Sequence, residues 1–89
     1  MYFIEIKPKF KKNVRKIKNF EDKKAVFNKM QEIANTLEFN PNHYKNLRKP
    51  MQKCKRVHIN TNFVMVFEVD NLNKKVIFYN YLHHDKIYK

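Results

Sequence analysis

Four side chains in the second half of the sequence have the chemistry needed for proton transfer and phosphate binding. Arg56 and His58 are two positions apart in an alternating segment, so they share a face if that segment is a β-strand. His84 and Tyr88 are four positions apart, and a short terminal turn would put both on one side. Histidine titrates near neutral pH, and the arginine fork binds two phosphate oxygens at once.

These residue types suit metal-free cleavage of RNA. In that reaction a base takes the proton from a 2′-hydroxyl, cations stabilise the charge developing on the phosphorane, and an acid protonates the leaving 5′-oxygen. Histidine can perform the first or the last task, and arginine the second. Each of the four side chains also has a purely structural interpretation, as a packed or hydrogen-bonded residue.

The other two histidines are weaker candidates. His83 directly precedes His84, so in extended backbone the two side chains point in opposite directions and only one of them joins His58. We interpret His83 as a structural or surface residue. His43 lies in a segment rich in proline and asparagine, where it is either an ordinary loop residue or a platform for a base.

Other kinds of site are disfavoured. No Cys-x-x-Cys pair and no two histidines at i, i+4 spacing are present, which argues against zinc even though Cys54 shares a face with His58 in the expected strand. Without glycine there is no phosphate-binding loop, and without serine there is no Ser-His-Asp triad. We therefore expect no metal and no cofactor. A single cysteine fits a reducing compartment.

Positive charge is concentrated in the first part of the chain. The formal net charge is +12, and residues 1–56 carry 16 basic and 5 acidic side chains. Such a surface attracts polyanions, although a solvated lysine-rich face is the simpler interpretation. If the partner is RNA, these side chains bind phosphates without reading sequence. The candidates for that role are Lys9, Lys11, Lys12, Arg15, Arg48, Lys49, Lys53 and Lys55.

Hydrophobic periodicity predicts an α+β fold in a single domain, residues 1–89. The expected order is a strand at 2–7, helices at 8–20 and from Glu21 to Leu37, a loop at 38–53, and strands at 54–59, 63–70 and 76–82. The last three strands form an antiparallel meander, and both helices cover one face of the sheet. Phe27 and Ala34 widen the apolar stripe of the second helix. Because glycine is absent, we expect asparagine at positive-φ turn positions.

No apolar run reaches the roughly 20 residues that cross a membrane, and the first residues lack the features of a signal peptide. We expect a cytoplasmic protein that does not associate with membranes.

Residues 47–88 resemble a known family. The segments "LRKP", "RVHI", "FVMVFEVD" and "HHDKIY", in this order within a βααβββ chain, look like toxins of the RelE/ParE superfamily from type II toxin–antitoxin systems. The nearest pattern is the RelE/YafQ branch, whose members cleave mRNA at the ribosome. The resemblance implies an acidic antitoxin as partner, the ribosome and mRNA as targets, and oligomers formed only through the antitoxin complex.

The resemblance also implies site residues. His58 matches an active-site histidine on the second strand of YafQ-like toxins, and His84 matches their C-terminal histidine. Tyr88 stands at the aromatic position that follows, and Arg56 at a basic strand position of RelE-like members. The expected roles are proton transfer for the two histidines, phosphate clamping for Arg56, and an accessory base or stacking platform for Tyr88.

Two positions depart from the family pattern. Val64 stands where RelE-like toxins usually carry an arginine, and Asn62 where YafQ-like toxins carry an acid. The first change removes a cation and the second a carboxylate. These departures leave two alternatives open, a noncatalytic ParE-like toxin that targets gyrase and a small basic RNA-binding module.

Overall fold

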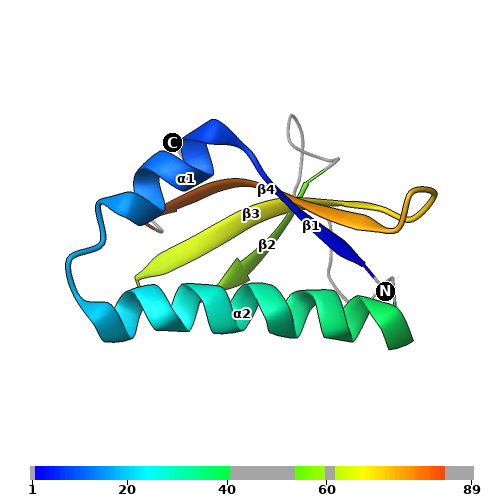
Figure 1. Ribbon diagram of the computed structural model, residues 1–89, viewed down its shortest axis with the longest axis horizontal. Coiled ribbons are helices and arrows are strands. Elements are labelled where there is room, and N and C mark those ends of the chain that lie inside the picture. The colour runs from blue at the N-terminus through cyan, green and yellow to red at the C-terminus, as the bar shows by residue number, and fades with distance from the viewer. Residues whose placement is uncertain (1, 41–53, 60–61, 84–89) are drawn as a thin grey trace.

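The computed structural model describes residues 2–40, 54–59 and 62–83 (Figure 1). Their order confirms the predicted strand, two helices and three strands. The elements are β1 (Phe3–Ile6), α1 (Pro8–Arg15), α2 (Phe20–Phe39), β2 (Lys55–His58), β3 (Phe63–Asp70) and β4 (Lys75–His83). Most of the predicted loop at 38–53 lies outside the described residues. No helix among the described residues is long and apolar enough to cross a membrane.

The four strands form one sheet in the order β1-β4-β3-β2. β2, β3 and β4 make the predicted antiparallel meander, whereas β1 runs parallel to β4, which makes the sheet mixed. Two parallel strands need a long crossover between them, and here the whole helical layer with the first two strands of the meander provides it. The α+β fold class is confirmed.

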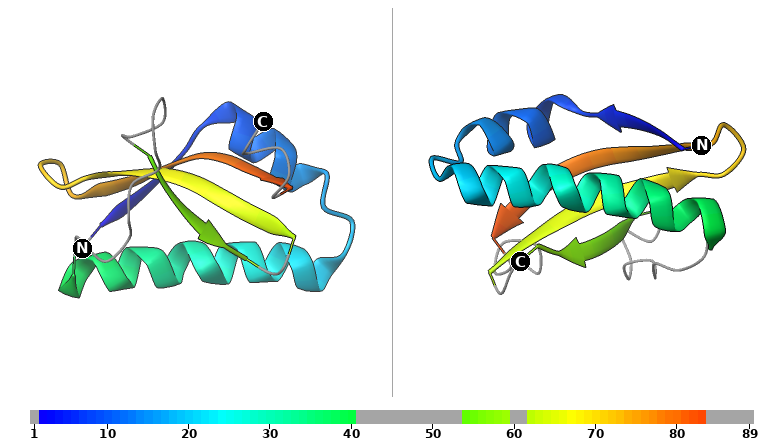
Figure 2. Two further views of the ribbon diagram at one scale, coloured as in Figure 1. Left: turned by 180° about the vertical axis from the view of Figure 1, so that it is seen from behind. Right: turned by 60° about the horizontal axis from the view of Figure 1, so that its bottom comes forward.

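Both helices pack on one face of the sheet, as the views in Figure 2 show. The core on this face joins buried side chains of both helices to alternate residues of β3 and β4. Phe78 lies at its centre, with its ring centroid 5.4 Å from that of Phe10 and 5.7 Å from that of Phe67. Alternation along the strands therefore places one set of side chains in this core and sends the other set to the opposite face, which we call the far face.

The helix boundary differs from the sequence prediction. The first helix ends at Arg15 rather than reaching residue 20, and Phe20 opens the second helix. Asn19 explains the boundary, because its Oδ1 accepts hydrogen bonds from the backbone N–H groups of Glu21 and Asp22 at 2.8 and 3.3 Å. This is an N-cap, which satisfies two of the amides that a helix start leaves without partners.

Two further details correct the prediction. Phe27 is 51% exposed, because it lies 100° around the helix from the buried Val26 and faces away from the core. Ala34 is buried, as expected. In the β3–β4 turn the positive φ falls on Lys74 (55°) rather than on an asparagine. Asn73 instead donates its backbone N–H and its Nδ2 to the carboxylate of Asp70, at 3.0 and 2.9 Å.

Candidate functional site

The predicted pair on β2 lies together on the far face. Arg56 and His58 are paired across the ladder with Val66 and Val64 of β3, while Val57 between them packs against the helix-side core. His58 is exposed and Arg56 is half-buried. The prediction that the two side chains share a face is confirmed.

The ladder partners of these two side chains are buried valines. Val64 is 0% and Val66 1% exposed, and neither belongs to the core formed with the helices. Both valines are covered and offer no surface to a ligand. Val64, one of the two departures from the family pattern, is a buried residue paired across the ladder with His58.

A second polar group lies further along the far face. The hydroxyl of Tyr79 donates a hydrogen bond to Glu68 Oε1 at 2.6 Å, and this bond to a carboxylate, with some burial, raises the pKa of Tyr79 to about 12. Burial, followed by the negative charge of Glu68, also raises the pKa of Cys54. A thiol with a raised pKa is protonated at neutral pH, which argues against Cys54 as a nucleophile.

The remaining predicted residues fall into two groups. His84, Tyr88, His43, Arg48, Lys49 and Lys53 lie outside the described residues. The others are described but do not join Arg56. Lys55 is paired with the core residue Phe67 and so lies on the helix side of β2. The basic residues of α1 are exposed on the helix side of the sheet; they are Lys9, Lys11, Lys12 and Arg15.

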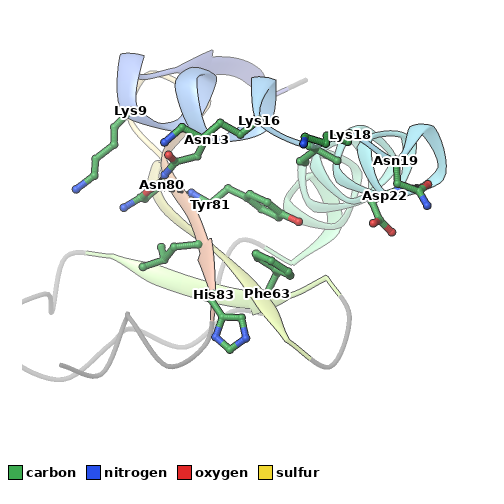
Figure 3. A pocket seen from close by; sticks show the side chains of 12 residues that line it. Lys9, Asn13, Lys16, Lys18, Asn19, Asp22, Phe63, Asn80, Tyr81 and His83 are labelled. Atoms are coloured by element: carbon green, nitrogen blue, oxygen red, sulfur yellow. Dashed lines mark hydrogen bonds between the residues drawn. The ribbon is translucent and has the colours of Figure 1, made fainter.

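A cavity that was not predicted from the sequence lies on the helix side, between α1, the start of α2 and the end of β4 (Figure 3). We call it the α1–β4 cavity; its volume is about 930 Å³. Its lining combines three cations, three amides, three rings and one carboxylate with two aliphatic side chains. These residues are Lys9, Lys16, Lys18, Asn13, Asn19, Asn80, Phe63, Tyr81, His83, Asp22, Ile17 and Leu82.

Aromatic packing fixes one wall of this cavity. The Phe63 ring stacks on Tyr81 with centroids 5.1 Å apart, and His83 meets Phe63 edge-on at 5.4 Å. Burial, then the charge of Asp22, raises the pKa of Tyr81. His83 is therefore on the helix side, paired across the ladder with Phe63, in agreement with its interpretation as a residue separate from the far-face pair.

Metal ligands do not gather in the described part of the chain. Within residues 2–40, 54–59 and 62–83, no three histidine, cysteine or carboxylate side chains are close enough to hold an ion.

The arrangement of helices and sheet is that of solved toxin structures. YafQ from E. coli superposes with a TM-score of 0.77 at 15% identity over 100% of both chains. A chain of the intact E. coli RelBE toxin–antitoxin complex gives a TM-score of 0.69 at 16% identity, covering 91% of this chain and 94% of that one. Identities this low establish a common fold and no more.

Sequence comparison gives the family. The model described as "ParE toxin of type II toxin-antitoxin system, parDE" matches residues 4–88. A relative from Methanocaldococcus jannaschii that carries the toxin name RelE4 is 50% identical over 91 residues, which span 100% of this chain and 93% of the relative. The chain therefore belongs to the RelE/ParE superfamily of type II toxins.

Proposed function

We propose that this toxin is a ribosome-dependent mRNA endoribonuclease that acts in the cytoplasm without a metal. The observation that supports it best is the pair formed by Arg56 and His58, which share the far face next to the buried Val64 and Val66. A titratable ring and a phosphate-binding fork side by side are two of the three groups that RNA cleavage needs.

In this mechanism His58 and His84 transfer the two protons. One takes the proton from the 2′-hydroxyl, whose oxygen attacks the adjacent phosphorus, and the other protonates the 5′-oxygen as its bond to phosphorus breaks. Arg56 binds the non-bridging oxygens, on which negative charge increases as the phosphorane forms. Tyr88 acts as an accessory base or stacks on a nucleotide.

The basic side chains position the toxin on its targets. The cations of α1 bind ribosomal RNA phosphates, together with Arg48, Lys49, Lys53 and Lys55, and this binding weakens with salt. The same positive surface binds an acidic antitoxin, and the solved RelBE complex supports such a partner through its shared fold. We propose oligomers only through that complex.

Expression in a host, followed by primer-extension mapping of mRNA ends, tests the proposal. We expect ribosome-dependent cuts that fall by about 10²- to 10⁴-fold in His58→Ala, the usual contribution of a positioned acid or base. His84→Ala should behave in the same way, and His43→Ala is the matched control that keeps the cuts. Wild-type toxin that leaves mRNA intact would overturn the proposal.

One alternative has an observation in its favour. The matching family model is that of ParE, and the buried Val64 replaces the cation of RelE-like toxins. A noncatalytic ParE-like toxin would bind gyrase, so expression would arrest growth with intact mRNA and trapped DNA breaks. Both readouts come from the same induced culture.

A further inference from the structure

Two of the three asparagines that line the α1–β4 cavity, Asn13 and Asn80, are oriented by the backbone. Asn80 Oδ1 accepts a hydrogen bond from the Tyr81 backbone N–H at 2.9 Å and another from Asn13 Nδ2 at 2.6 Å. A backbone N–H only donates, so the contacting atom of Asn80 must be its oxygen, and that of Asn13 must be its nitrogen. The amide orientations therefore follow from chemistry.

This leaves the Nδ2 group of Asn80 and the Oδ1 atom of Asn13 available to a ligand as donor and acceptor. Asn80 Nδ2 and Asn13 Oδ1 make no hydrogen bond within residues 2–40, 54–59 and 62–83. Both side chains line the cavity and meet across it from α1 and β4 (Figure 3). An amide donor and an amide acceptor are the groups with which asparagine recognises the edge of a nucleobase.

Cations surround this amide pair. Lys9 and Lys16 lie four positions before and three positions after Asn13, so the three residues form one stripe along α1 that lines the cavity. Lys18 adds a third cation from the connection to α2, against a single carboxylate, Asp22. Lysines at this spacing can bind the phosphates on either side of a base held by the amides.

The position of the cavity links it to the far face. His58, Val64 and Leu82 lie in one row across β2, β3 and β4, and the next row pairs Phe63 with His83. His83 lines the cavity on the helix side, while His58 belongs to the far face. Both regions therefore meet at the same end of the sheet, where a single strand of RNA can pass from one to the other.

We propose that the α1–β4 cavity binds nucleotides of single-stranded RNA next to the segment presented to His58. Asn80 and Asn13 hydrogen-bond a base edge, Lys9 and Lys16 bind the flanking phosphates, and the rings of the wall supply stacking surface. The proposal deepens the proposed function and rests on it for the choice of RNA as ligand. An acidic peptide would also suit the lysines, but a rigid donor–acceptor pair beside rings matches a base more closely.

The test uses a short fluorescent single-stranded RNA in which every 2′-hydroxyl is methylated, so that binding is measured without cleavage. In Lys9→Ala/Lys16→Ala we expect affinity to fall by about tenfold or more. The slope of log K against log salt should become shallower by about 1.4, because each phosphate contact on a single strand contributes about 0.7. Lys23→Ala/Lys24→Ala removes the same charge from α2, outside the cavity, and is the matched control.

A second variant probes the amide pair directly. Asn80→Asp keeps an oxygen for Tyr81 N–H and Asn13 Nδ2 but replaces the outward donor with a negatively charged acceptor. We expect at least tenfold weaker RNA binding, with an unchanged circular dichroism spectrum. Because methylated RNA cannot be cut, these results are independent of whether the toxin is a nuclease.

Two outcomes would overturn the proposal. Equal weakening by both lysine double variants would mean that RNA is held by diffuse charge. Loss of antitoxin binding in Lys9→Ala/Lys16→Ala, with RNA affinity unchanged, would assign the cavity to a protein partner. If the cavity variants lose RNA binding while wild-type toxin leaves mRNA intact in cells, the cavity proposal stands and only the nuclease assignment fails.

Discussion

The far face and the α1–β4 cavity meet at one end of the sheet, yet they present different chemistry. The far face carries a cation and a titratable ring, Arg56 and His58, beside buried valines. The cavity carries neutral amides whose orientation is fixed by a backbone N–H, with cations around them. The first arrangement suits charge and proton transfer and the second suits recognition, so separate substitutions can remove one and leave the other.

The largest loss of stability should come from substituting the residue on which both regions depend. Phe78→Ala removes a ring that is fully buried between Phe10 and Phe67. We expect the free energy of unfolding, measured by urea denaturation, to fall by about 3–5 kcal/mol, with loss of both regions together. The control is Phe27→Ala, which removes a half-exposed ring and should cost much less. A loss below about 1 kcal/mol for Phe78→Ala would contradict this account of the core.

A smaller loss of stability is expected from a substitution at the cavity wall. Asn19→Ala deletes the N-cap of α2, and we expect the free energy of unfolding to drop by about 1 kcal/mol, since two backbone amides lose their acceptor. Asn28→Ala, on the exposed middle of the same helix, should instead be neutral or slightly stabilising because alanine has the higher helix propensity. Equal losses in the two variants would argue against the cap.

The smallest change in stability at neutral pH is expected from a substitution on the far face. Glu68→Gln removes the carboxylate that raises the pKa of Tyr79, so that pKa should move from about 12 toward its ordinary value of 10.0. A raised folded-state pKa means that the folded protein holds the proton more tightly, so stability falls as pH rises from about 10 to 12. The variant should lose this dependence.

Spectroscopic titration of phenolate absorbance measures that pKa, and Tyr79→Phe identifies its share of the signal among the five tyrosines. An unchanged alkaline titration in Glu68→Gln would show that the hydrogen bond to Glu68 is not the cause of the raised pKa of Tyr79.

Local patterns account for most of the fold. A continuous apolar run, typical of a central strand, located β3 at its observed bounds, and helical spacing found the buried stripe of α2. The parallel pairing of β1 was not predictable in this way, because alternation describes the faces of a strand and not its neighbour. The boundary between the helices was missed, although an asparagine before a helical stretch, here Asn19 before α2, is a recognisable N-cap signal.

The candidate site was predicted only in part. Arg56 and His58 were found because strand alternation alone puts them together. The amide pair was missed because Asn13 and Asn80 are 67 positions apart. Strict alternation would put Tyr79 and Tyr81 on one face. The pairing of β3 with β4 shifts register at Val66/Phe67, so Tyr81 lies in the core and Tyr79 is hydrogen-bonded to Glu68 on the far face.

The parallel pairing of β1 with β4 also orders events during synthesis. Phe3 is paired with Lys75 and Ile6 with Phe78, so every ladder partner of the first strand is made 72 positions after it. Until then β1 has no partner strand, and the core lacks Phe78 and Tyr81. β1 therefore cannot join the sheet until β4 has been made, and contacts of such long sequence separation form slowly. The sheet that carries both regions closes only at that stage.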